Sequence, residues 1–260
     1  MTGEAPEGSQ SEKKGRVRAS PLRSALIRDV LIVFVGALTL STLMRVFVFQ
    51  MFDVLSGSME NTLMTGDRIV AQKVVGYQRG DIIVFADTLG WTRKPRTPST
   101  TADVLAFLGL GPDLSRNTMV KRVVGLPGDR VVCCNADSLI TINGFPVDPR
   151  GYLYTDPVTE EPDEPSMSAF DIVVPVGKLF VLGDHRSNSE DSRYFLCNTP
   201  AGQPKGSAAF VPQENVIGTV VAIVFPFDQF TGLSRPAVFD GVPPPDGPAP
   251  PEPIINLFPC

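Results

Sequence analysis

Residues 30–44 have the sequence VLIVFVGALTLSTLM, an apolar run without a charged side chain. A helix needs about 20 apolar residues to cross a bilayer, so this run suffices only if its flanks contribute. Arg45 can extend its charged end to the membrane interface while Val46 to Gln50 continue the helix. We therefore predict a transmembrane helix over residues 26–50.

A cleaved secretory signal and a buried core helix are the two alternatives to a membrane anchor. A secretory signal also has a basic start and a short apolar centre, but no small-x-small cleavage site follows this run. A buried core helix of 15 residues is the simpler alternative, but this run is far more apolar than amphipathic. We favour the membrane anchor over both.

The basic residues that flank the apolar run lie mainly before it. Only Arg45 is basic between residues 45 and 64, whereas the preceding segment contains Lys13, Lys14, Arg16, Arg18, Arg23 and Arg28. By the positive-inside rule, the N-terminus is cytoplasmic and the chain after Arg45 lies outside. Residues 1–25 are polar and charged, which predicts a disordered cytoplasmic tail.

Beyond the apolar run, short β-branched segments alternate with turns. Asn143-Gly144 is a strong hairpin turn. We predict an all-β domain over residues 51–240, with a Pro-, Thr- and Gly-rich insertion at 88–117 and an extended proline-rich tail at 241–260. The segments that suit strands are RIVAQKVV, DIIVF, VKRVVGL, RVVCC, SLITING, FDIVV, KLFVL and IGTVVAIVFP.

Composition excludes several kinds of function. The formal net charge is −5, which gives no basic surface for nucleic acid. A single histidine and four cysteines at Cys133, Cys134, Cys197 and Cys260 match no zinc pattern. The sequence contains no phosphate-binding or dinucleotide-binding glycine motif, so we expect neither a metal nor a cofactor.

The first candidate for chemistry is the cluster Ser56-Gly57-Ser58-Met59, shortly after the predicted membrane helix. Such clusters are common in loops, so the cluster alone says little. The second candidate is Lys121, between Val120 and Arg122. If Lys121 points inward from a strand, burial lowers its pKa, and a neutral amine can take the proton of a serine hydroxyl. From spacing alone, a surface lysine is the more common outcome.

The third candidate is the polar loop GDHRSNSEDSRY at residues 183–194, which follows an apolar strand. Three motifs in this order behind an apolar helix resemble those of bacterial signal peptidase I: SGSMxxTL, KRVVGLPGD and GDxRxNSxDSR. The segment RGDIIVF at 79–85 fits the same family. The resemblance covers residues 30–226, and the 88–117 insertion is similar to those of actinobacterial members. It implies a mostly β, LexA-like barrel or sandwich domain outside the bacterial plasma membrane.

The resemblance also implies a function and a set of site residues. The activity would be serine endopeptidase cleavage of preprotein signal peptides after small-x-small motifs, at the bilayer and near the secretion translocon. Ser58 matches the nucleophile and Lys121 the general base. The supporting matches are Ser56 for the oxyanion, Ser189 for orienting the lysine, Asp191 and Arg193 with Asp184 for bracing the loop, and Val54, Met59, Leu63 and Val120 for the substrate pockets.

The chain departs from the family pattern at two positions, and two alternative functions stay open. Leu55 and Asn61 stand where family members often have proline, which leaves the pocket shape less certain than the mechanism. One alternative is a Ser-His-Asp hydrolase, which would have to use His185, the single histidine, and the other is a non-catalytic extracytoplasmic binding module. One of Cys133 and Cys134 is expected to pair with Cys197, because neighbours on a strand point to opposite faces.

Overall fold

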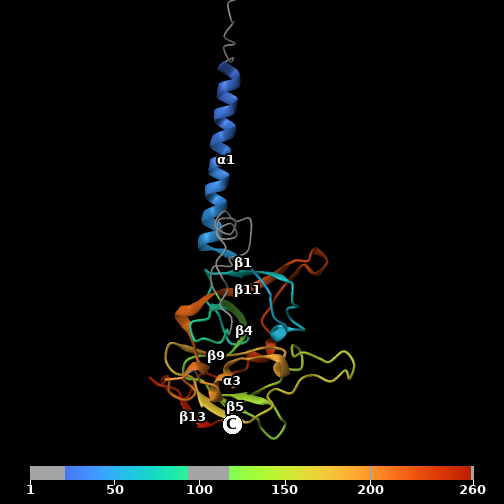
Figure 1. Ribbon diagram of the computed structural model, residues 1–260, viewed down its shortest axis with the longest axis vertical. Coiled ribbons are helices and arrows are strands. Elements are labelled where there is room, and N and C mark those ends of the chain that lie inside the picture. The colour runs from blue at the N-terminus through green and yellow to red at the C-terminus, as the bar shows by residue number, and fades with distance from the viewer. Residues whose placement is uncertain (1–20, 93–116, 200, 259–260) are drawn as a thin grey trace, which may run out of the picture. The chain divides into compact units, whose positions relative to one another are not determined.

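The structure is a computed structural model that describes residues 21–92, 117–199 and 201–258 (Figure 1). The chain divides into two compact units, one up to Ser41 and one from Thr42 onward. In the described part of the chain, one helix is long and apolar enough to cross a membrane, over Ala25–Met44. Its large apolar side chains, such as Val33 and Phe34, are exposed.

Helix α1 spans Pro21–Phe47, so its position differs from the predicted 26–50. It begins earlier, with a proline at the first helical position, where the missing N–H costs nothing. It ends earlier because strand β1 starts at Phe49 and pairs with the neighbouring strand β2. The additional helical length therefore comes from the N-terminal side of the apolar run, and the expectation that the helix continues to Gln50 was wrong.

The unit from Thr42 onward is built of antiparallel strands, which confirms the mostly β prediction. One sheet has the order β1-β2-β11-β3-β4-β9-β10, with β12 paired to β11, and the other has the order β13-β8-β5-β6-β7. The strands are β1 (Phe49–Asp53), β2 (Arg68–Gln72), β3 (Ile82–Ala86), β4 (Thr118–Gly125), β5 (Arg130–Cys133), β6 (Ile140–Ile142), β7 (Phe145–Val147), β8 (Phe170–Val173), β9 (Lys178–Leu182), β10 (Val211–Pro212), β11 (Val216–Phe225), β12 (Thr231–Gly232) and β13 (Ile254–Leu257).

Local sequence explains several of these elements. In β2 the pattern RIVAQ buries Ile69 and Ala71 and leaves the alternate residues half-buried, as a strand with one face in the core requires. Asn143 and Gly144 both have positive φ and connect Ile142 to Phe145, which is the predicted two-residue hairpin turn.

Two hydrophobic clusters form the core of the β unit. The larger joins both sheets and includes Ile83, Val123 and Phe180. The smaller packs against β1, β2, β3 and β11 and includes Met59 and Leu63. Strand β4 contributes to both, because Val123 lies in the first cluster and Val120 packs against the second. β4 therefore crosses the centre of the domain.

The proline-rich segment is not a free extended tail. Strand β13 pairs with β8 and forms an edge of the smaller sheet. Before it, the carbonyl oxygens of Pro243 and Pro250 accept hydrogen bonds from Asn143 Nδ2 at 2.9 Å and from the Val176 N–H at 2.8 Å. Proline lacks a donor but keeps its acceptor, so the segment can be held through its carbonyl groups. The folded chain thus continues beyond residue 240. Most of the 88–117 insertion lies outside the described residues.

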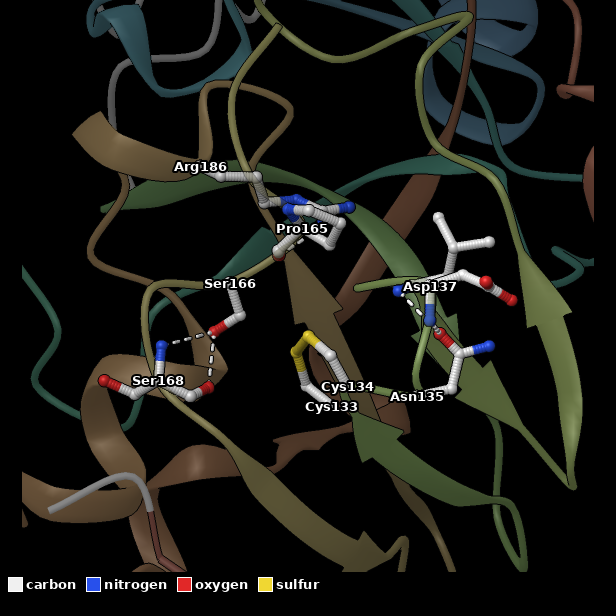
Figure 2. The surroundings of a disulfide bond; sticks show 9 residues. Cys133, Cys134, Asn135, Asp137, Pro165, Ser166, Ser168 and Arg186 are labelled. Atoms are coloured by element: carbon white, nitrogen blue, oxygen red, sulfur yellow. Dashed lines mark hydrogen bonds between the residues drawn. A yellow bond between two sulfur atoms is a disulfide. The ribbon is translucent and has the colours of Figure 1, made fainter.

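The cysteine pairing differs from the expectation. Cys133 and Cys134 are bonded to each other across a cis peptide bond (Figure 2). Cys197 also belongs to a disulfide, but neither Cys133 nor Cys134 is its partner. The prediction assumed that strand alternation extends through Cys134, whereas β5 ends at Cys133. The two side chains are therefore not held on opposite faces.

Candidate active site

Ser58 lies in a short 3₁₀ turn, Gly57–Met59, just beyond the end of β1. Met59 and Leu63 anchor this turn in the smaller hydrophobic cluster, and the Leu63 N–H donates to the Met59 carbonyl at 2.8 Å. Ser58 itself is 7% exposed. The apolar residues after the serine thus fix the turn, and the serine hydroxyl is left at the edge of the core.

Lys121 comes from β4, where it pairs with Ile83 of β3. Its side chain is 2% exposed, and its Nζ lies 2.5 Å from Ser58 Oγ. Burial lowers the pKa of Lys121 to about 8, and the carboxylate of Asp191 opposes part of that shift. The amine can therefore lose its proton near neutral pH, as a base acting on a serine hydroxyl must.

Ser56 lies on the same turn, and its Oγ is 3.4 Å from Ser58 Oγ. Ser56 is exposed. Its hydroxyl is thus next to the position at which a substrate carbonyl would meet Ser58. A donor at this position can stabilise the negative oxygen that forms when the carbonyl is attacked.

The polar loop that begins at Gly183 packs directly behind Ser58. A side chain at Gly183 would collide with the Ser58 carbonyl oxygen and with Ser189 Oγ, so only glycine allows this approach. Ser189 Oγ is buried and has no hydrogen-bond partner among the described residues. The structure thus brings Ser189 next to the Ser58 turn, but without the hydrogen bond to Lys121 that the family resemblance implied.

Asp191 and Arg193 brace this loop. Asp191 is fully buried, forms an ion pair with Arg193 at 2.7 Å and accepts the Gly183 N–H at 3.0 Å. It also caps the N-terminus of helix α3 (Ser192–Cys197) by accepting the Arg193 N–H. Burial raises the pKa of Asp191, but the Arg193 guanidinium and the hydrogen bonds outweigh burial and hold that pKa below its usual range. The carboxylate is thus charged and positioned near Lys121.

Asp184 forms a separate buried pair with Arg122, the residue after Lys121. Arg122 Nη2 lies 2.5 Å from Asp184 Oδ2, and the Thr62 hydroxyl donates to the same oxygen at 2.6 Å. The Arg122 guanidinium also lies 4.4 Å from the centre of the Tyr152 ring. This network joins β4, the turn after Ser58 and the polar loop. The motifs SGSMxxTL and KRVVGLPGD contain Thr62 and Arg122 but gave neither residue a role, although strand alternation required an inward or edge position for one of Lys121 and Arg122.

His185 does not face Ser58 Oγ. Its Nδ1 lies 2.7 Å from Glu60 Oε2, and its ring stacks on Tyr154 at 3.8 Å. Its backbone N–H donates to the Ser58 carbonyl at 3.1 Å. Within the described residues, no hydrogen bond joins the imidazole to Ser58 Oγ, so the geometry of a Ser-His-Asp triad is not formed.

A cavity of about 470 Å³ opens beside the serine and the lysine. Val54, Met59 and Val120 line it, whereas Leu63 is fully buried and does not. Trp91 also lines it, held by a 2.8 Å hydrogen bond from its Nε1–H to the Ala208 carbonyl. The full lining consists of Phe52, Asp53, Val54, Leu55, Ser56, Ser58, Met59, Trp91, Thr92, Thr118, Met119, Val120, Lys121 and Glu190.

A serine hydrolase with a lysine base requires a serine hydroxyl within hydrogen-bond distance of a buried amine. Ser58 and Lys121 meet this requirement, and they lie beside a cavity that can hold a peptide. The family model described as signal peptidase, peptidase S26, matches residues 27–225. The chain therefore belongs to the signal peptidase family, whose members are serine endopeptidases.

Several signal peptidases are similar in sequence to this chain over most of their length. A "probable signal peptidase I" of Mycobacterium leprae is 32% identical over 83% of this chain and 82% of its own. The signal peptidase I of Mycobacterium tuberculosis H37Rv is 32% identical over 79% of this chain and 75% of its own. A crystal structure of a signal peptidase I from Enterococcus faecalis covers 56% of this chain and 98% of its own, with 26% identity and a TM-score of 0.30.

Proposed function

We propose that this chain removes the N-terminal signal peptides of secreted preproteins, with Ser58 as nucleophile and Lys121 as general base. The observation that carries the proposal is the 2.5 Å separation between Lys121 Nζ and Ser58 Oγ, with the amine 2% exposed. In its neutral form the amine accepts the Ser58 proton, and Oγ attacks the carbonyl carbon of the scissile bond.

The steps after attack use the same two side chains. The Ser58 N–H and the Ser56 hydroxyl stabilise the oxyanion. The Lys121 ammonium then gives its proton to the leaving amine, and the acyl group remains on Ser58. Lys121, neutral again, activates the water that hydrolyses this ester. Asp191 and Arg193 keep the loop of Ser189 against the pair.

The cavity beside the pair suits a peptide with small side chains before the cut. Val54, Met59 and Val120 provide shallow apolar walls, and Leu63 supports Met59 from within the core. Alanine and similar side chains fit such walls, whereas larger ones are excluded by steric clash. The substrate can bind in extended form along Phe52–Leu55 and Thr118–Lys121.

The membrane arrangement completes the proposal. Ala25–Met44 would cross the bacterial plasma membrane once, with a cytoplasmic tail before it and the β domain outside. The domain limits proposed from sequence, 26–50 and 51–240, then shift to about 21–47 for the helix and to residue 49 for the start of the β domain. The bilayer and the secretion translocon are the proposed surroundings, because the substrate arrives there.

Cleavage of a preprotein in detergent by four proteins tests the proposal. We expect the wild type and His185→Ala to be active, and Ser58→Ala and Lys121→Ala to be inactive. Activity in Lys121→Ala would exclude the lysine as base. Loss of activity only in His185→Ala and Ser58→Ala would favour a histidine-dependent hydrolase, and an inactive wild type would favour a binding module.

A further inference from the structure

A second cavity, of about 620 Å³, lies along the polar loop. Its volume is in the range of about 300–1,000 Å³ that ligand sites occupy. The two cavities share one lining residue, Glu190. The second cavity is lined by Ser166, Met167, Ser168, Arg186, Ser187, Asn188, Ser189, Glu190, Arg193, Tyr194, Cys197 and Asn198.

Hydrogen bonds fix the two walls of this cavity relative to each other. Arg186 is buried, and its Nη1–H donates to the Pro165 carbonyl at 2.6 Å (Figure 2). Arg193 donates to the Arg186 carbonyl at 3.0 Å. Ser166 Oγ donates to the Ser168 carbonyl at 2.9 Å and so holds the turn that forms the opposite wall. The cavity is thus built on the same loop that braces the Ser58–Lys121 pair.

The position of the second cavity follows from the direction of the substrate. The residues before the cut occupy the cavity of Val54, Met59 and Val120, and the leaving amine must lie at Lys121, which protonates it. Ser189 Oγ packs beside Gly183 next to the Ser58 carbonyl, and Glu190 is close enough to Lys121 to raise its pKa. A chain that continues past Lys121 therefore reaches Ser189 and Glu190, where the second cavity begins.

We propose that this second cavity binds the first residues of the mature protein, those after the cut, in an extended conformation. The inference rests on the proposed function, because it needs the cut to occur at Ser58. The lining offers polar and apolar surface in similar amounts, and hydroxyl and amide groups such as those of Ser187 and Asn188 can hydrogen-bond to a peptide backbone. Mature sequences differ between preproteins, and a site of mixed polarity that bonds to the peptide backbone tolerates that variety better than a deep apolar pocket.

The test compares two peptides that are identical before the cut and extend two or ten residues beyond it. We expect the wild type to cleave the longer peptide with a kcat/KM about tenfold higher, because contacts remote from the reacting bond contribute to the transition state. Ser168→Trp fills the cavity and should remove this advantage while leaving the short peptide unchanged. Met167→Trp, at the exposed rim, is a second filling variant.

Two control variants isolate the effect of filling. Ser168→Ala removes the same hydroxyl without adding bulk, and Val158→Trp adds an indole at an exposed position that lines neither cavity. Both should retain the wild-type preference for the longer peptide. The inference is overturned if the wild type cleaves both peptides equally, or if the filling variants keep the preference or slow both peptides alike. Failure of the wild type on both peptides would instead contradict the proposed function.

Discussion

At the scale of single residues, the pKa of Lys121 sets the pH range of activity. Burial lowers this pKa to about 8, and the base acts only when neutral. Below about pH 8, kcat/KM should therefore rise about tenfold per pH unit and then level off. Initial rates on a short peptide at concentrations far below KM, measured at a series of pH values, give this profile. A flat profile between about pH 6 and 9 would contradict a lysine base with this pKa.

The same lowered pKa predicts an effect on stability. The unfolded chain binds the lysine proton up to its ordinary pKa of 10.5, whereas the folded chain releases it near 8. Stability therefore rises with pH between these values, and below about pH 8 the folded state carries the full penalty. Lys121→Met removes the penalty and should stabilise the protein by about 3 kcal/mol at pH 7.

Urea unfolding at a series of pH values checks this second prediction. The advantage of Lys121→Met should shrink as the pH rises from about 8 through 10.5, because above that pH the wild-type lysine is neutral in both states. Ser58→Ala is a suitable control, because it is also inactive but keeps the amine. A constant difference at all pH values would indicate packing rather than charge.

His185 should support the Ser58 turn without taking part in the chemistry. Its contacts with Glu60 and Tyr154 hold the ring away from Ser58 Oγ. We expect His185→Asn to keep kcat within about tenfold of wild type, since a triad histidine would cost several orders of magnitude. Single-turnover kinetics on a short peptide separate the two outcomes. A loss of about 10⁴-fold would restore the triad alternative.

At this scale, sequence motifs predicted the residue types of the site better than their contacts. Ser58 and Lys121 lie 63 positions apart, and their proximity followed only from a family resemblance. The sequence assigned Glu60 and Trp91 no role in the site, because their positions depend on partners distant in sequence, His185 and Ala208. A polar residue two positions after a candidate nucleophile was the only local signal for Glu60.

At the scale of elements, the pair Arg122–Asp184 holds strand β4 to the polar loop. Both side chains are at most 2% exposed. Asp184→Ala leaves the guanidinium buried without its partner and should cost about 3–5 kcal/mol. The comparable change in the pair Arg130–Asp171, where the arginine is 59% exposed, should cost less than about 1 kcal/mol.

Urea denaturation of Asp184→Ala and Asp171→Ala makes this comparison directly. Activity should follow stability, because the polar loop that packs on Ser58 is tied to β4 through Asp184. Thr62→Val tests the third member of the network, whose hydroxyl donates to the charged Asp184 carboxylate and should contribute about 1.5–3 kcal/mol. Equal losses in the two aspartate variants would show that burial of the ion pair is not what matters.

Elements with strong local signals were predictable, and elements formed by distant pairing were not. Alternation in RIVAQ and the Asn143-Gly144 turn specify structure within a few residues. Strand β13 needs β8, about 80 positions earlier, and composition alone suggested a polyproline segment instead. The end of β5 at Cys133 likewise depends on its sheet partners, so the pairing of Cys133 with Cys134 had no local signal.

At the scale of the whole molecule, the chain is divided between an apolar helix and a β domain that forms its own compact unit from Thr42 onward. The residues proposed for catalysis all belong to the second unit. A protein that lacks residues 1–41 should therefore cleave a short soluble peptide with a kcat/KM within about twofold of wild type, because no proposed transition-state contact is lost.

The anchor should matter only when the substrate is itself in a membrane. Anchoring both partners in one bilayer raises their effective concentration, which can increase apparent affinity by about 10²–10⁴ without any new contact. We expect the protein without residues 1–41 to process a preprotein in vesicles at least about tenfold more slowly than the full chain. Ser58→Ala in both backgrounds is the control for cleavage by other proteases. Equal rates in vesicles would show that the helix contributes nothing to substrate capture, and loss of peptide cleavage would show that the β domain depends on the helix for its active form.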